Sequence, residues 1–374
     1  MDNLKRTLEE LSRKAGGVTG KQALVGLDGF VDRIMHVVGK RHGPGTAYEP
    51  MPTIEAWGEK ISAAAGKSAN FEMWLQREKL GGNGPIMANA LLAAGVDLRY
   101  LGMLGQPVHP VFAEFAQRSK ATSLGSPGIT HALEFSDGKI MLGAMADYDN
   151  LTYQRIIDSV GEGVFFDLLS RTDLVGLVNW TMIPHLTSIF NDLLTKVLPH
   201  LPPKENGRTF FFDLCDPAKR SASDLRGALS AIRRFQGHGR SVLGLNLAEA
   251  KQVAAVLELP FAGEEPRDLE TAAMKIRQQL EIECVIIHPR DGAACATREA
   301  TAYVKGPFVA HPKISTGAGD HFNAGFCLGL LLGLSPLACL TVAVATSGQY
   351  VRTAESPSLS STQAFLERWS AGEV

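Results

Sequence analysis

The chain has 374 residues, of which 45% are hydrophobic, and its 37 basic and 39 acidic side chains give a formal net charge of −2. This composition excludes the disordered and fibrous classes, and without a basic excess it gives no indication of nucleic-acid or membrane binding. The length allows one large α/β core with a small appendage. We therefore expect a single domain over residues 1–374, with neither a nucleic acid nor a membrane as its partner.

Residues 1–14 alternate charged residues with leucines at helical spacing and contain no apolar segment of a signal peptide. The longest apolar run, residues 326–334, is too short and too rich in glycine to span a bilayer. We therefore expect a cytoplasmic protein. The five cysteines form no C-x-x-C pair and the histidines lack metal-ligand spacing, so neither a disulfide framework nor a zinc site is predicted.

Residues 23–30 (ALVGLDGF) predict a buried strand that ends in a glycine turn, and the apolar pattern resumes over 31–38. Asp28 and Asp32 would then lie at or just past a strand end. Ionised carboxylates accept hydrogen bonds strongly and in two directions, so both are candidates for binding substrate hydroxyls. For Asp28, a role that only stabilises the turn before Gly29 is an equal alternative. Asp32 is the stronger candidate.

A glycine-rich turn, Gly-Gly-Asn-Gly at residues 81–84, opens a helix predicted over 86–94. A dinucleotide-binding fingerprint would require a buried strand before these glycines. Residues 76–79 are polar, which argues against that interpretation. Gly82 and Asn83 instead suit the close approach of a polyhydroxylated ligand to the backbone.

Two stretches do not fit the alternation of strands and helices. Residues 41–80 are mostly polar and predict a helix over 53–65 but no strong strand. Residues 132–135 and 139–144 predict a hairpin, because an Asp-Gly pair joins two short β-like runs. This hairpin would leave the main sheet as a small β appendage.

Further along the chain, apolar strand-like runs alternate with helical stretches, which favours a mostly parallel sheet covered by helices on both faces. The predicted strands cover residues 98–103, 174–178, 209–214, 241–245 and 284–288, and the predicted helices cover 183–198, 222–235 and 268–280.

Residues 315–320 (STGAGD) form the strongest candidate for a site with chemistry. The small residues precede a long apolar helix, so the backbone N–H groups of Gly317, Ala318 and Gly319 can point at an anion at the positive end of the helix dipole. Asp320 lies in the first helical turn, where it could simply stabilise the helix start. Beside an anion site, however, this carboxylate could also take the proton from an attacking hydroxyl.

Asn246 and Glu249 follow the strand predicted over 241–245, at the edge of an open α/β sheet where ligands bind. Asn246 could be a helix cap. Glu249 could hold Mg²⁺ through water, because this ion keeps part of its hydration shell in proteins.

Taken in order, G-L-D-G-F-V-D near the start, G-G-N-G before a helix, N-L-A-E after a middle strand and G-A-G-D before an apolar helix resemble the ribokinase (PfkB) family of carbohydrate kinases. The resemblance extends from about residue 23 to residue 352. It implies an α/β fold in which a mostly parallel sheet lies between helices, with a small β lid over the sugar. The lid elements would lie within residues 33–80 and 130–146.

The resemblance also implies roles for single residues: Asp320 as catalytic base, Gly317, Ala318 and Gly319 as the anion hole, Asn246 and Glu249 for Mg²⁺ and phosphate, Asp32 as the sugar-binding acid, and Gly82 with Asn83 at the substrate. The chain departs from the family pattern at two places. Ile314 and Ser315 replace an Asp-Thr pair, and residues 287–292 (IHPRDG) replace T-L-G-x-x-G, of which Gly292 keeps the last glycine near the nucleotide.

These residues imply a Mg²⁺-dependent phosphotransferase that moves the terminal phosphate of a nucleotide to a hydroxyl of a sugar or related polyol. ATP is the expected nucleotide. ADP as donor and a nucleoside as acceptor stay open. The two departures motivate a second hypothesis, a catalytically silent sugar- or nucleotide-binding regulatory protein. An exposed edge of the lid could pair two copies into a homodimer.

Overall fold

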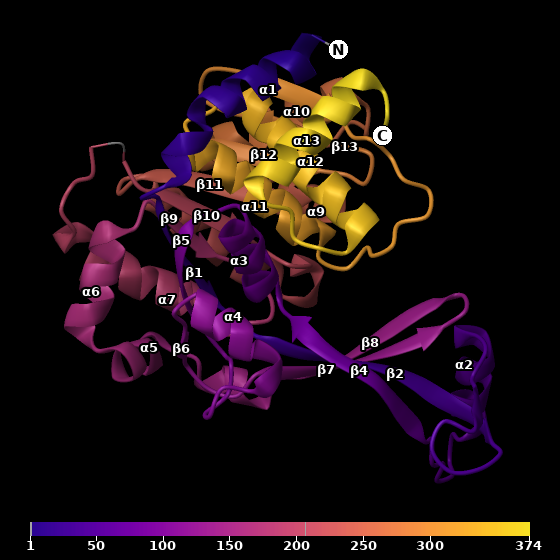
Figure 1. Ribbon diagram of the computed structural model, residues 1–374. Coiled ribbons are helices and arrows are strands. Elements are labelled where there is room, and N and C mark those ends of the chain that lie inside the picture. The colour runs from indigo at the N-terminus through magenta and orange to yellow at the C-terminus, as the bar shows by residue number, and fades with distance from the viewer. Residues whose placement is uncertain (1, 206) are drawn as a thin grey trace.

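In the part of the chain that the computed structural model describes, residues 2–205 and 207–374, nine strands form the central sheet in the order β14-β13-β12-β11-β10-β9-β1-β5-β6 (Figure 1). Neighbours from β12 to β6 run parallel, whereas β13 and β14 are antiparallel at one edge. The strands are β1 (Gln22–Leu27), β5 (Asp97–Gly102), β6 (Thr122–Ser123), β9 (Leu174–Leu177), β10 (Thr209–Asp213), β11 (Arg240–Asn246), β12 (Cys284–His288), β13 (Gly292–Ala296) and β14 (Thr301–Lys305).

The middle strands are apolar runs because both faces of the sheet are covered. Every residue of β9 and β10 is buried, as a parallel sheet between helix layers requires. The strands predicted over 98–103, 174–178, 209–214, 241–245 and 284–288 are confirmed. The antiparallel strands β13 and β14 were not predicted, because β13 consists of small residues with weak β propensity and β14 is partly exposed.

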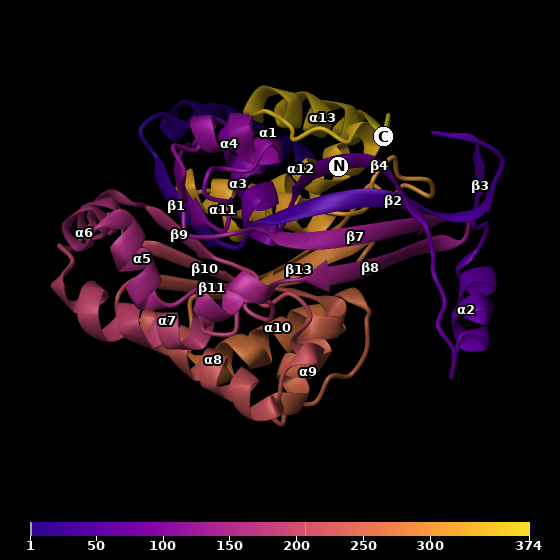
Figure 2. The same ribbon diagram turned by 90° about the horizontal axis from the view of Figure 1, so that it is seen from below.

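Helices cover the two faces of the central sheet as separate layers, each with its own apolar cluster (Figures 1 and 2). One layer contains α1 (Asp2–Lys14), α3 (Asn83–Ala93), α4 (Ala113–Arg118), α11 (Ala318–Leu331), α12 (Pro336–Thr353) and α13 (Leu359–Ala371). The other contains α5 (Tyr153–Val160), α6 (Glu162–Arg171), α7 (Leu186–Asp192), α8 (Ala222–Phe235), α9 (Leu247–Val256) and α10 (Pro266–Leu280). Among the described residues, no helix has the length and apolarity needed to cross a membrane.

A second sheet projects from this body (Figure 1). It contains β2 (Phe30–Arg41), β3 (Tyr48–Pro50), β4 (Met73–Gly81), β7 (Gly128–Phe135) and β8 (Gly138–Ala144), and α2 (Ile54–Ala63) packs on it. The strands β7 and β8 form the predicted hairpin, and α2 lies within the helix predicted over 53–65. Because β1 ends at Leu27 and β2 begins at Phe30, the chain passes from the central sheet into the second sheet across two residues.

Two expectations for this region were wrong. Residues 41–80 do contain a long strand, β4, which pairs with β2 from Phe30 to Val37. Most of its side chains are exposed, so the strand carries no apolar alternation that a sequence pattern could reveal. Asp32 does not lie at a strand end either, because it is the third residue of β2.

Candidate active site

Polar side chains gather where the parallel strands of the central sheet end. Asp28 follows β1, Asp213 is the last residue of β10, and Asn246 and His288 are the last residues of β11 and β12. The helices α3 and α11 begin at the same edge and contact each other. Open α/β sheets bind ligands at this edge, because loops and helix N-termini surround it there.

Asp28 is completely buried, and its carboxylate is occupied by protein donors. One oxygen accepts from the backbone N–H of Asn83 at 2.9 Å and the amide of Asn179 at 2.7 Å. The other accepts from the N–H of Gly84 at 2.9 Å and the hydroxyl of Tyr100 at 3.2 Å. Burial raises the pKa of Asp28 to about 6 although these hydrogen bonds oppose the shift. The carboxylate thus holds the 81–84 turn and not the turn before Gly29, which was the alternative role for Asp28.

The glycines of the 81–84 turn let this carboxylate reach the backbone. A Cβ atom on Gly84 would lie 2.4 Å from Oδ1 of Asp28, and one on Gly82 would lie 2.9 Å from Oδ2. Gly82 also has φ +98°, which side chains with a Cβ rarely adopt. The glycine pattern therefore seats Asp28 below the N-terminus of α3.

Asp32 lies where the second sheet joins the body. It is opposite Lys79 of β4 and Thr130 of β7, and its side chain is 5% exposed. Burial raises its pKa, while the charge of Lys79 and a hydrogen bond from Thr130 lower it. A Cβ atom on Gly81 would lie 2.5 Å from Cγ of Asp32, so this carboxylate packs against the backbone of the glycine-rich turn.

Asn83 connects the glycine-rich turn to the loop before α11. Its amide donates a hydrogen bond of 3.0 Å to Oδ1 of Asp320. Asp320 is buried, which raises its pKa well above the usual range, and the charges of Asp28 and Glu249 act in the same direction. The hydrogen bond from Asn83 opposes this shift. Two motifs that are 237 positions apart in the sequence thus meet at one carboxylate.

The loop before α11 presents free backbone donors. Gly317 has φ +87° and precedes the first helical residue, Ala318. The N–H of Ala318 donates to the carbonyl of Ser315 at 3.2 Å, whereas those of Gly317 and Gly319 have no acceptor among the described residues. Of the three N–H groups predicted to form an anion hole, two are therefore free.

Asn246 and Glu249 form a capping box at the start of α9. The side chain of Asn246 accepts from the N–H of Glu249 at 3.0 Å, and Glu249 accepts from the N–H of Asn246 at 2.9 Å. The second oxygen of Glu249 accepts from the N–H of Asp216 at 3.0 Å. Burial raises the pKa of Glu249. The cap that was one alternative for Asn246 is present, and it places Glu249 at the site edge.

Three further polar residues of this region were not predicted. Asp213 accepts a hydrogen bond of 3.1 Å from the amide of Asn323, and burial together with the charges of Glu249 and Asp320 raises its pKa well above the usual range. Oδ1 of Asp213, Asn179 and Asn323 is buried without a hydrogen-bond partner. The only sequence signal for Asp213 was its place at the end of the strand predicted over 209–214. Asn179, with φ +61°, offered none.

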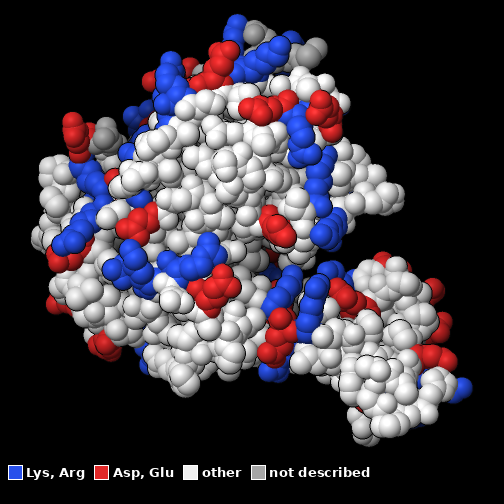
Figure 3. Space-filling view, viewed as in Figure 1, with Lys and Arg blue, Asp and Glu red and all other residues white. Residues whose placement is uncertain are grey.

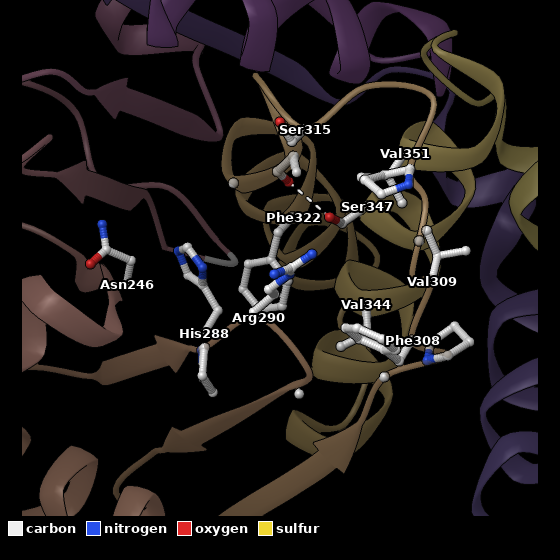
Figure 4. A pocket seen from close by; sticks show the side chains of 18 residues that line it. Asn246, His288, Arg290, Phe308, Val309, Ser315, Phe322, Val344, Ser347 and Val351 are labelled. Atoms are coloured by element: carbon white, nitrogen blue, oxygen red, sulfur yellow. Dashed lines mark hydrogen bonds between the residues drawn. The ribbon is translucent and has the colours of Figure 1, made fainter. Parts of the chain in front are cut away.

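A cavity of about 690 Å³ opens beside the loop before α11 (Figure 4). Ser315, Ala318 and Gly319 lie at its loop end, and apolar side chains such as Phe308 and Val344 form its wall. Asn246 and Gly292, both predicted to bind the nucleotide, also line the cavity, as does His288. The ring of His288 lies 4.7 Å from that of Phe322, and burial lowers its pKa to about 4.

The surface shows acidic and basic side chains close together over the body and at its junction with the second sheet (Figure 3). No broad cationic area covers the face shown in this view. The charges near Asp32 illustrate this mixture, because Lys79 interacts with Asp32, Lys139, Arg77 and Glu134.

Comparisons with known proteins agree with this geometry. The family model of prokaryotic ketohexokinase matches residues 2–369. A ketohexokinase from Haloferax volcanii is 31% identical over 353 residues, covering 93% of this chain and 91% of the relative. A fructokinase with bound ATP from Xylella fastidiosa has a TM-score of 0.64 at 16% identity, covering 94% of this chain and 99% of that chain. Ribokinase from Thermotoga maritima has a TM-score of 0.59 at 16% identity, covering 93% and 99%.

The two structures confirm the ribokinase-like fold that the ordered motifs implied. The family match and the curated relative confirm a carbohydrate kinase, that is, a phosphotransferase acting on a sugar, and nothing in them supports the catalytically silent alternative. The chain belongs to the prokaryotic ketohexokinase family.

Proposed function

We propose that this kinase transfers the terminal phosphate of ATP to a hydroxyl of a ketohexose, with Asp320 as the general base. The observation that carries the proposal is the hydrogen bond of 3.0 Å between Asn83 and Asp320. It joins the turn proposed to bind the acceptor to the loop that faces the cavity for the donor. Asp320 would therefore lie between the two substrates.

In this reaction the acceptor oxygen attacks the terminal phosphorus atom, its proton passes to the carboxylate of Asp320, and the bond from phosphorus to the leaving oxygen of ADP breaks. Buried surroundings raise the pKa of Asp320, which makes its carboxylate a stronger base than an exposed aspartate. The free N–H groups of Gly317 and Gly319 would stabilise negative charge on the transferred group. The N–H of Ala318, bonded to Ser315, would support the loop.

The acceptor would lie between the second sheet and the 81–84 turn. Asp32 would accept from sugar hydroxyls, and Gly82 and Asn83 would contact the sugar through backbone and amide groups. Asp28 would contribute by holding the turn, since its oxygens are already occupied. A ketohexose is the acceptor class named by the matched family and by the Haloferax relative.

The donor would occupy the cavity beside the loop, with its base and ribose against the apolar wall and its phosphates toward Gly319. Asn246 and Gly292 line this cavity and would contact the nucleotide. ATP is the proposed donor, and the Xylella fructokinase structure holds bound ATP.

The residues present fit a Mg²⁺ ion at the strand ends. Oδ1 of Asp213 is buried without a hydrogen-bond partner, and the charge of Asp213 interacts with that of Glu249. A cation here would give this oxygen a partner and offset the repulsion between the two carboxylates. No group of three metal-type ligands exists among the described residues, which suits an ion held mainly by phosphates and water. Glu249 would hold it through water. When bound, Mg²⁺ would neutralise charge on the phosphates.

We further propose that the chain acts as a single domain, that the second sheet is the lid over the acceptor, and that the protein works as a cytoplasmic homodimer. Two apolar side chains on this sheet are nearly half exposed to solvent: the exposed fraction is 44% for Leu75 and 45% for Leu142. Such side chains beside an unpaired strand edge favour association with a second copy.

The proposal is tested by assaying the purified protein against fructose, glucose, ribose and a nucleoside, each with ATP or ADP and with or without Mg²⁺. We expect turnover with fructose, ATP and Mg²⁺ at least tenfold above every other combination. Faster turnover of an aldose or a nucleoside than of fructose would contradict the ketohexose as acceptor. Undiminished turnover after chelation of Mg²⁺ would contradict the proposed role of this ion.

A further inference from the structure

Two carbonyl groups at the start of α11 accept hydrogen bonds from side chains of α12, one of which, Ser347, also lines the cavity. The hydroxyl of Tyr350 donates to the carbonyl of Thr316 at 2.9 Å. The hydroxyl of Ser347 donates to the carbonyl of Ala318 at 2.9 Å, the bond marked in Figure 4. Both residues lie on the helix that packs along α11, and none of the motifs found in the sequence includes them.

These two hydrogen bonds determine where two N–H groups point. A trans peptide unit is planar, so its C=O and N–H point in opposite directions. Holding the carbonyl of Thr316 therefore directs the N–H of Gly317, and holding the carbonyl of Ala318 directs the N–H of Gly319. Gly317 precedes α11 and Gly319 lies in its first turn, and neither N–H group has an acceptor among the described residues.

His321 supports Tyr350 from the side. The two rings stack with centroids 3.5 Å apart and planes within 12°. One ring nitrogen of His321 is 2.7 Å from the carbonyl of Gly317 and the other is 2.9 Å from the hydroxyl of Ser356. Burial lowers the pKa of His321 to about 4, so the ring is neutral near pH 7, with one nitrogen donating and the other accepting.

The hydroxyl of Tyr350 stays a donor under working conditions. Burial, with the charge of Asp320, raises its pKa to about 12. The side chain is buried and cannot exchange this hydrogen bond for water easily. Each of the two peptide units has a glycine on one side, which allows it more rotational freedom than other residues would, whereas an anion site needs donors that are oriented before the reaction.

We propose that Tyr350 and Ser347, with His321 as the support of Tyr350, are positioning residues for phosphoryl transfer: they aim the N–H groups of Gly317 and Gly319 at the transferred phosphoryl group. This inference rests on the proposed role of the loop as the anion site. It assigns the orientation of that site to α12, which lies outside every motif of the chain.

The test uses Tyr350→Phe, Ser347→Ala and His321→Gln in the full chain. Because the N–H groups would act mainly on the transition state, we expect kcat to fall about tenfold in each of the first two variants, and less in the third, with KM for fructose and ATP unchanged. Thr341→Val is the matched control, since among the described residues this α12 hydroxyl donates to the carbonyl of Leu337 in its own helix and to no group of the loop. The control should retain wild-type kcat.

A binding measurement separates positioning from general weakening of the site. Calorimetry with ADP, aluminium fluoride, Mg²⁺ and fructose measures affinity for a mimic of the transferred phosphoryl group. We expect Tyr350→Phe and Ser347→Ala to bind this mixture about tenfold more weakly than wild type while binding ADP alone equally well. Equal affinity for the mixture, or equal loss for ADP alone, would overturn the inference. If the wild type itself does not bind the mixture, the proposed function fails instead.

Discussion

The central sheet and the second sheet carry carboxylates four residues apart that differ in their surroundings. Asp28, at the end of β1, is surrounded by four protein donors. Asp32, in β2, interacts with the hydroxyl of Thr130 and with the charges of Lys79 and Lys139, all of which lower its pKa. The carboxylate of Asp28 is thus satisfied by protein donors, whereas that of Asp32 keeps capacity for a ligand. In the proposed function, Asp28 accordingly holds the structure and Asp32 binds the substrate.

The largest expected effect tests the structural side of this comparison. Asp28→Ala leaves the N–H groups of Asn83 and Gly84 and the side chains of Asn179 and Tyr100 without their acceptor. We expect the free energy of unfolding to fall by about 3 kcal/mol or more, because buried donors that lose a partner are costly. Chemical denaturation measures it, and a loss below about 1 kcal/mol would contradict the structural role.

Asp32→Ala tests the proposed role of Asp32 in binding the sugar. We expect stability to change by less than about 1 kcal/mol, while KM for fructose rises at least about tenfold, because sugar hydroxyls lose a charged acceptor. Steady-state kinetics and denaturation of the same preparation give both values. The comparison breaks down if this variant unfolds as readily as Asp28→Ala, or if KM stays at the wild-type value.

The hydrogen bond between Asn83 and Asp320 should affect how kcat depends on pH. The hydrogen bond from Asn83 lowers the pKa of Asp320, so Asn83→Ala should raise it. A base must be deprotonated to act, and kcat should therefore fall as pH decreases, with this acid limb at higher pH in the variant than in the wild type. A profile of kcat against pH at saturating substrates measures the shift. A limb that stays in place or moves to lower pH would argue against Asp320 as the titrating base.

The smallest effect on folding is expected on the outer surface of the second sheet. Leu75→Glu with Leu142→Glu replaces exposed apolar side chains, so stability of the monomer should change by less than about 1 kcal/mol. If this surface joins two copies, sedimentation should show a dimer for the wild type and a monomer for the variant. A wild-type monomer, or a dimer that the substitutions leave intact, would show that the second sheet does not form a dimer interface.

The same contrast explains what the sequence could predict. The strands β9 to β12 are continuous apolar runs because helices cover both faces, so their pattern is visible without a structure. Most side chains of β4 are exposed, so its apolar and polar residues do not alternate and no pattern distinguishes it from a loop. Secondary structure was therefore predictable where burial imposes a pattern.

The residues of the candidate site also differ in whether the sequence could reveal them. Asp320, Asn83, Asn246 and Glu249 were identified because they lie in short motifs at the starts of helices. Asp213 was missed, since a single aspartate at a strand end has no motif around it. Tyr350 and Ser347 act on the loop from α12, 27 or more positions after Asp320, and only the fold places them there. Local geometry is readable from sequence, whereas support from a distant element is not.

The most direct test of Asp320 as the base is to measure kcat for Asp320→Asn and, by calorimetry on the same protein, its binding of ADP and of fructose. We predict that kcat falls about 100- to 10,000-fold while both ligands bind with affinity close to that of the wild type. Asp97→Asn, which alters a surface carboxylate paired with Lys120, should leave kcat unchanged. Turnover of Asp320→Asn within a few fold of the wild type would contradict the mechanism.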